Sequence, residues 1–118
     1  MPIITPLLAF ALLTSPIQQG QDAASEPLQC MAGPVQRSFG ETDWLTYACA
    51  DHSTLIVVSA PGNPAMPFVF TLSRTDAGVR VSGEGNGDRG ATAAAFEDLK
   101  KVSVEDLDRM VREAELHP

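Results

Sequence analysis

The sequence has few basic residues. It contains 8 Lys and Arg against 15 Asp and Glu in 118 residues, which gives a formal net charge of −7. Proteins that bind nucleic acids gather Lys and Arg on one face to contact phosphates, whereas the basic residues here are spread along the chain. We therefore expect no nucleic-acid partner. The acidity favours a cationic protein, if the chain has a charged partner at all.

The chain also lacks an apolar run of the roughly 20 residues that a transmembrane helix needs. Its N-terminal apolar run, from Ile3 to Leu13, spans about eleven residues, which is typical of the central region of a secretory signal peptide. No Lys or Arg precedes this run, so only the terminal amine supplies positive charge there. A buried N-terminal strand or helix is the alternative interpretation.

Small residues follow the apolar run and offer a cleavage pattern at Ala23 and Ser25. We expect residues 1–25 to be a signal peptide with its cleavage region, and residues 26–118 to form one small domain. The mature protein would then be periplasmic or secreted, with no stable membrane span after removal of the signal.

Cysteine is scarce, with only two residues, Cys30 and Cys49. In an exported chain, two cysteines most simply form one disulfide. The loop that this disulfide closes, about 20 residues long, would stabilise the fold by roughly 3 kcal/mol in the chain-entropy model. Reduced thiols are the alternative if the chain is not exported.

The single Trp and the single Tyr both lie in the stretch from Trp44 to Ser73, which we interpret as three consecutive strands. Residues 44–49 alternate between two faces, as a strand does. Residues 54–60 are apolar on both faces, which predicts a central strand that is covered on both sides. Residues 68–73 alternate again, and the loop before them is rich in proline.

Shorter patterns flank these strands. Residues 35–39 predict an edge strand, Gly40–Asp43 predicts a turn, and residues 79–82 predict a last, half-exposed strand. The short connections indicate an antiparallel meander of four to five strands.

Two helices follow Gly90. Residues 91–101 are rich in helix-forming residues, and Ser103 is a plausible N-cap for a second helix. Strands followed by helices indicate an α+β fold. We expect both helices to pack on one face of the sheet, the face that carries Phe68, Phe70, Leu72, Val79 and Val81. The second helix has an apolar stripe of Val104, Leu107, Met110, Val111 and Ala114, with Glu105 and Arg109, and Asp108 and Arg112, spaced for ion pairs.

The stretch Gly85–Gly90 matches the glycine pattern of dinucleotide-binding proteins. That fold needs a strand, a helix and a second parallel strand, and too little chain remains for them. Glu84, Asn86 and Asp88 are spaced as at the start of a calcium loop, but Arg89 and Ala95 stand where that loop requires Gly and Glu. We expect no cofactor and no metal, and interpret the glycines as positive-φ residues of a turn into a helix.

Catalytic residue types occur side by side at Asp51, His52 and Ser53. Neighbours on one tight turn cannot converge as a hydrolase triad requires. Cys30, Cys49, His52 and His117 lack the spacing of a zinc site. His117, next to the C-terminus, is expected to be frayed. We therefore expect no enzymatic activity.

The remaining candidate is the proline-rich loop. A stiff loop loses little conformational entropy when it docks, as rigid inhibitor loops do. The alternative interpretation is a connection without a binding role, in which the prolines keep sheet edges from associating. The candidate interaction residues are Pro61, Asn63, Pro64, Met66, Pro67 and Phe68.

Three segments carry a resemblance to known proteins: Trp44 to Asp51, Val57 to Phe68, and Gly83 to Asp88 with the Ala-rich helix that follows it. Together they resemble a group of small, uncharacterised, exported bacterial proteins. The resemblance implies export and a single compact domain, and it implies no activity. We expect a non-catalytic binding module that is inhibitor-like in the way its loop docks. The alternatives are a structural or stress-related envelope protein without a specific partner, and an enzyme that uses Asp51, His52 or residues 84–88.

Overall fold

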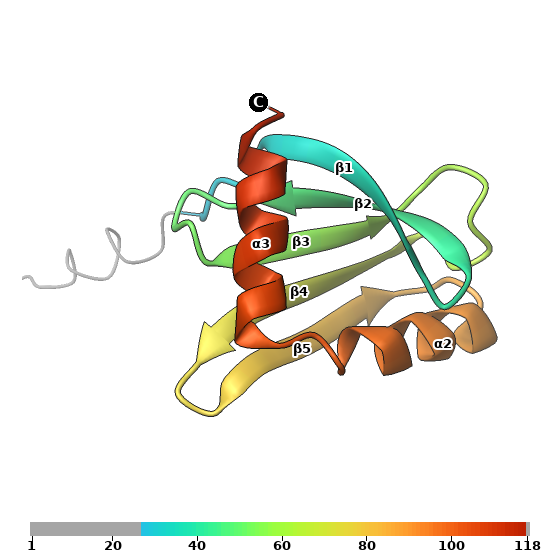
Figure 1. The fold of residues 1–118 in the computed structure, drawn as a ribbon. Helices are drawn as coiled ribbons and strands as arrows, with labels where there is room; N and C mark the ends of the chain where they lie inside the picture. Colours follow the sequence, from blue (N-terminus) through green and yellow to red (C-terminus); the bar gives the residue numbers. More distant parts are fainter. Residues whose placement is uncertain (1–26, 118) are drawn as a thin grey trace, which may run out of the picture.

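The computed structural model describes residues 27–117, and the expected signal peptide lies outside these residues. Five strands form one antiparallel sheet in the order β1-β2-β3-β4-β5, a simple meander (Figure 1). The turn between the first two strands is confined to Gly40 and Glu41, shorter than the sequence predicted. The strands are β1 (Ala32–Phe39), β2 (Thr42–Ala48), β3 (Thr54–Ser59), β4 (Phe68–Thr75) and β5 (Gly78–Gly85).

Two helices, α2 (Arg89–Leu99) and α3 (Val104–Glu115), follow the sheet. Both lie on the same face, with α3 crossing the strands and α2 beside the end where β5 leads into it (Figure 1). The α+β fold predicted from the sequence is therefore confirmed. In the part of the chain that the structure describes, no helix is long and apolar enough to cross a membrane.

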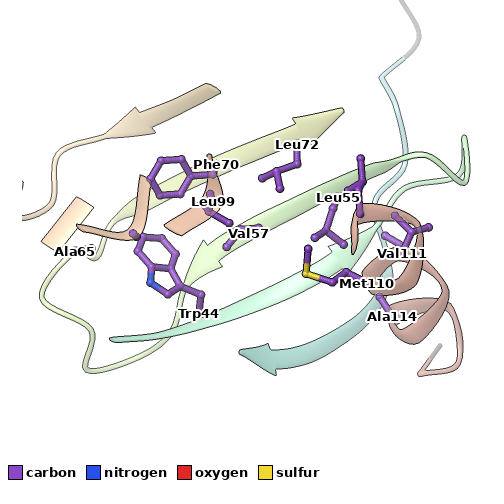
Figure 2. Close-up of a cluster of buried hydrophobic side chains, with 13 residues drawn as sticks. Trp44, Leu55, Val57, Ala65, Phe70, Leu72, Leu99, Met110, Val111 and Ala114 are labelled. Atoms are coloured by element: carbon purple, nitrogen blue, oxygen red, sulfur yellow. The ribbon is translucent and has the colours of Figure 1, made fainter. Parts of the chain in front are cut away.

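The hydrophobic core lies between this face of the sheet and the helices (Figure 2). Trp44 is fully buried and its ring lies 5.3 Å from that of Phe70. Its indole N–H donates to the carbonyl oxygen of Phe39 over 3.1 Å, so the polar atom of this side chain keeps a partner. Strands and helices contribute the rest of the core, which includes Leu55, Val57, Leu72, Leu99, Leu107, Met110, Val111 and Ala114.

The start of α3 follows the sequence prediction. Ser103 is the N-cap, and its hydroxyl accepts a hydrogen bond from the backbone N–H of Asp106, whose carboxylate bonds back to the Ser103 N–H. The i,i+4 ion pairs predicted for this helix are wrong. Arg109 pairs with Asp106, one turn earlier, and Asp108 pairs with Arg74 of β4. The second pair forms because α3 crosses the sheet and brings Asp108 over β4.

The disulfide between Cys30 and Cys49 is present, as predicted. The backbone N–H of Ala50 also donates to the carbonyl oxygen of Gln29 over 2.7 Å, so the segment before β1 is joined twice to the end of β2. His117 is held rather than frayed, because its carbonyl oxygen accepts a hydrogen bond of 2.7 Å from the Gly33 N–H.

The central strand differs from its prediction. Leu55 and Val57 of β3 are buried beneath the helices, but Ile56 and Val58 point to the opposite face and are only half-buried. No element among residues 27–117 covers that second face, which we call the open sheet face. The prediction that β3 is covered on both sides is therefore wrong for the described residues.

Candidate functional site

Three connections meet at one end of the sheet, which we call the loop end. In an antiparallel meander, alternate connections lie at the same end, so the β1–β2 turn, the β3–β4 loop (residues 60–67) and the β5–α2 connection (residues 86–88) gather there (Figure 1). The β1–β2 turn is fixed to α2, because the Gly40 N–H donates to the Asp98 carboxylate over 2.6 Å. The loop end is thus a set of connections bonded to the helix layer.

Asn63 fixes the first half of the β3–β4 loop. Its side-chain N–H donates to the carbonyl oxygen of Asp43 on β2 over 2.7 Å, and its side-chain oxygen accepts from the Ala65 N–H over 2.8 Å. Both groups of the amide are therefore used inside the protein. Asn63 is 7% exposed, so it holds the loop and is not available to a partner.

The second half of the loop rests on the β5–α2 connection. The N–H groups of Asn86 and Asp88 donate to the carbonyl oxygens of Pro67 and Pro64 over 3.0 and 3.1 Å. Gly87 lies between them and approaches the loop so closely that a Cβ there would sit 1.7 Å from the Ala65 carbonyl oxygen. A side chain at position 87 is incompatible with this contact.

The glycine pattern noted in the sequence therefore has a structural use that its spacing did not reveal. Of its three glycines only Gly85 has the predicted positive φ, at 148°, and the prediction is wrong for Gly87 and Gly90. Gly87 is required for close backbone contact, and Asp88 is the N-cap of α2, accepting from the Ala91 N–H over 2.8 Å. Gly85, Gly87 and Asp88 thus support the β3–β4 loop by direct backbone contact with it.

Ala65 anchors the loop in the core. It is fully buried, and Figure 2 shows it at the end of the core where Trp44 and Phe70 meet. Its neighbour Met66 is 52% exposed. The loop therefore presents one large apolar side chain to solvent directly beside a residue that is fixed in the core.

The six candidate loop residues divide into two groups. Pro61, Pro64, Met66 and Pro67 are exposed. Asn63 is buried, and Phe68 is half-buried with its ring 4.8 Å from that of Phe70, so both belong to the support of the loop. The sequence could not separate the groups, since the division depends on the contacts that Asn63 makes with β2 and Phe68 makes with Phe70.

Two hollows flank the loop. The first, which we call the Met66 hollow, has a volume of about 400 Å³ and opens beside the open sheet face. Its walls are mainly apolar, with Glu84 and Asn86 as its polar side chains apart from the buried Ser59. The lining residues are Val58, Ser59, Met66, Pro67, Phe68, Val69, Glu84, Gly85 and Asn86.

The second hollow, which we call the acidic hollow, lies on the other side of the loop and has a volume of about 280 Å³. It is lined by Glu41, Thr42, Asp43, Pro61, Gly62, Asn63 and Pro64. Neither hollow has a Lys or Arg among its lining residues. The exposed prolines and Met66 therefore lie between Glu84 on one side and Glu41 and Asp43 on the other.

The open sheet face continues from the Met66 hollow. Leu45 pairs with Val58, Val58 with Val69, and Val69 with Glu84, so these four side chains form one row across β2 to β5. The apolar members are half-buried, and the row ends in an exposed carboxylate. Tyr47 and Ile56 form the start of the next row. An antiparallel sheet that faces water usually carries polar residues on that side, which makes this row a candidate contact surface.

The residue types associated with catalysis lie at the opposite end of the sheet and do not converge. The Asp51 carboxylate accepts hydrogen bonds from the backbone N–H groups of Ser53 and Thr54 and from the Thr54 hydroxyl, all within its own turn. His52 has its Nδ1 atom 2.5 Å from a Glu115 carboxylate oxygen and is not among the hydrogen-bond partners of the Asp51 carboxylate. Between residues 27 and 117, no group of three or more His, Cys, Asp or Glu side chains could hold a metal ion.

The pKa of Asp51 reflects its structural use. Partial burial raises this pKa, but hydrogen bonds from Thr54 and Ser53 to the carboxylate lower it more, and the net result is a pKa below the ordinary value. A general base near neutral pH would need the opposite shift. The carboxylate stabilises the turn between β2 and β3.

A second apolar patch surrounds the disulfide. Met31 is 75% exposed and lines a hollow there together with Cys49, His52 and Glu115.

The chain matches no protein-family model, no curated protein and no solved structure. The resemblance to exported bacterial proteins stays a prediction, and the function has to be argued from the loop end of the sheet.

Proposed function

We propose that the protein is a non-catalytic binding module that docks onto another protein through the exposed part of the β3–β4 loop. One observation carries this proposal. Met66 is 52% exposed on a loop whose neighbouring residues, Ala65 and Asn63, are buried and hydrogen-bonded. An exposed apolar side chain on a fixed backbone is the arrangement that a rigid docking loop needs.

The energetic reason is the low cost of ordering. Association immobilises side chains and loops, and each flexible side chain that becomes fixed costs about 0.5–1.5 kcal/mol. The hydrogen bonds at Asn63, Asn86 and Asp88 already fix the loop backbone in the free protein. Methionine is enriched at protein interfaces because its flexible thioether adapts to the partner surface. The loop thus combines a fixed backbone with one adaptable contact residue.

We further propose that the protein works in the periplasm or as a secreted protein. The Cys30–Cys49 disulfide supports this, because disulfides persist in oxidising compartments and are rare in the cytosol. Mass spectrometry of protein purified from its host should find an N-terminus near residue 25 and both sulfurs oxidised. An intact chain with two free thiols would contradict export.

Affinity capture tests the binding function. The full-length oxidised chain, immobilised by a tag, is incubated with an extract of its host, and retained proteins are identified by mass spectrometry. The same capture is made with Met66→Asp, which puts a charge at the proposed contact. The matched control is Met31→Asp, the same change at an exposed methionine beside the disulfide. Phe68 is left unchanged because its ring packs on Phe70.

The proposal predicts a protein that is retained by the original chain and by Met31→Asp and is lost with Met66→Asp. Fluorescence of the buried Trp44 and circular dichroism show that each variant is folded. A retained protein that survives Met66→Asp in a folded variant would remove the loop from the contact. If nothing is retained reproducibly, a structural envelope role is favoured instead.

A further inference from the structure

We infer that the loop end takes a basic segment of a partner protein, one that places an apolar side chain in the Met66 hollow and Lys or Arg side chains against Glu84 and the acidic hollow. This inference rests on the proposed function and specifies the chemistry of the partner.

The Met66 hollow suits an apolar side chain. Val58 and Val69 form its floor on the open sheet face, and Met66 and Pro67 of the loop complete its apolar wall. Its volume of about 400 Å³ is within the range of small ligand pockets, which run from about 300 Å³ upward. Filling it with a Leu-sized or aromatic side chain would bury apolar surface that is now half-exposed.

The charges beside the hollows select the flanking residues. Glu84 lines the Met66 hollow, and Glu41 and Asp43 line the acidic hollow across the loop. None of these three carboxylates forms an ion pair within residues 27–117. A basic residue of a partner would therefore meet acids that are not already neutralised by an internal cation.

The basic residues of the protein lie elsewhere. Four of them pair with acids in the helix layer: Arg37 with Glu113, Arg74 with Asp108, Lys100 with Glu97 and Arg109 with Asp106. Arg89 is near the loop end, but it lines a separate groove with Phe70 and Phe96 between α2 and the sheet. Arg80 lies on the open sheet face opposite Ser73, on the same side of β5 as Glu84 but four residues earlier in the strand. A cationic segment is attracted to the hollows and repelled from these two places.

One segment can reach both hollows because the same loop lines both. Pro61 and Pro64 belong to the acidic hollow, and Met66 and Pro67 belong to the Met66 hollow. A segment laid across the loop would contact the prolines in the middle and carboxylates at either side. The pattern expected in the partner is an apolar residue with basic residues on both flanks.

The test uses random linear peptides displayed on phage and selected against the full-length oxidised chain. The expected result is enrichment of peptides that carry Lys or Arg on both sides of one apolar residue. Such a peptide, made synthetically, is titrated into the isotopically labelled protein. The backbone amide signals of Met66, Val69 and Glu84 should shift, and those of Met31 and Asp76 should not.

Two variants with the same charge change separate local from general attraction. Glu84→Gln should weaken binding of the selected peptide roughly three- to tenfold, as removal of one partner of a partly desolvated ion pair does. Asp76→Asn is the control, because Asp76 is in the β4–β5 turn at the opposite end of the strands. Equal effects of the two variants would show attraction to net charge alone and would overturn the inference.

The remaining outcomes distinguish this inference from the proposed function. If the selected peptides are neutral or acidic but shift Met66 and Val69, the basic partner is excluded and the binding function stands. If the peptides are basic but bind at another surface, the inference is overturned as well. If no peptide is selected and host-extract capture with Met66→Asp also shows no loss, both proposals fail.

Discussion

The shape of the β3–β4 loop depends on the absence of a side chain at Gly87. Replacing it with Ala would place a Cβ 1.7 Å from the Ala65 carbonyl oxygen and 2.2 Å from the carbonyl carbon. Neither partner is the end of a flexible side chain, so the backbone of the loop or of the β5–α2 connection has to move. That movement strains or breaks the hydrogen bonds from Asn86 to Pro67 and from Asp88 to Pro64.

The magnitude follows from these contacts. Overpacking a well-packed site costs about 1–3 kcal/mol, and each lost backbone hydrogen bond adds about 1 kcal/mol. If one of the two hydrogen bonds is lost, Gly87→Ala should therefore lower the free energy of unfolding by roughly 2–4 kcal/mol. It should also weaken partner binding, because the loop would no longer be held in one shape.

Urea unfolding followed by the fluorescence of Trp44 measures this effect, since that side chain is fully buried in the folded protein. The control is Gly90→Ala, the same change in α2, where the new Cβ meets only a carboxylate oxygen of Asp88 at 3.2 Å. We expect the control to change stability by less than about 1 kcal/mol. An unfolding midpoint for Gly87→Ala that equals that of the original chain would refute the proposed support of the loop.

Two further predictions concern stability. Replacing Cys30 and Cys49 together with Ser should lower the free energy of unfolding by about 3 kcal/mol, because a disulfide with a sequence separation of 19 no longer restricts the unfolded chain; urea unfolding measures it, and an unchanged midpoint would contradict the estimate. Asp51→Asn should be less stable than the original chain at neutral pH, and this difference should shrink as the pH falls. The reason is that hydrogen bonds lower the folded-state pKa of Asp51, so the carboxylate's stabilisation is complete above the ordinary Asp pKa of about 3.9 and is lost as the pH falls through the lower folded value. Unfolding curves at several pH values give the difference, and one that does not vary with pH would exclude this contribution.

Local patterns were sufficient to predict the fold class. Alternation placed Trp44 and Phe70 in strands, the capping sequence at Ser103 began the last helix, and two cysteines implied one disulfide. These features depend on neighbours in sequence or on composition, which the sequence shows directly.

The open sheet face could not be predicted in the same way. Ile56 and Val58 are apolar, and apolar residues on both faces of a strand usually mean burial on both sides. Whether a second layer covers them depends on which face of the sheet the helices pack against. Both helices follow the last strand and pack on the same face of the sheet, so that among the described residues only one face of β3 is covered.

The candidate site was predicted in part. The proline-rich sequence indicated the loop as a candidate site. The burial of Asn63 and the close approach of Gly87 could not be predicted, because they depend on contacts between segments that are distant in the chain. In the sequence, the spacing of Glu84 from Asn86 and Asp88 resembled only the start of a calcium loop. Its place beside Met66 follows from the β4–β5 register, which puts Glu84 opposite Val69.

Site-specific photo-crosslinking in the host tests most directly whether the loop end contacts a partner. A photoreactive amino acid is introduced at position 66, and at position 31 as the control, in the otherwise unchanged full-length chain. The structure leads us to expect one dominant cross-linked protein from position 66, with a surface that carries basic residues around an apolar one, and no such product from position 31. The absence of a product from position 66, or the same products from both positions, would contradict a binding site at the β3–β4 loop.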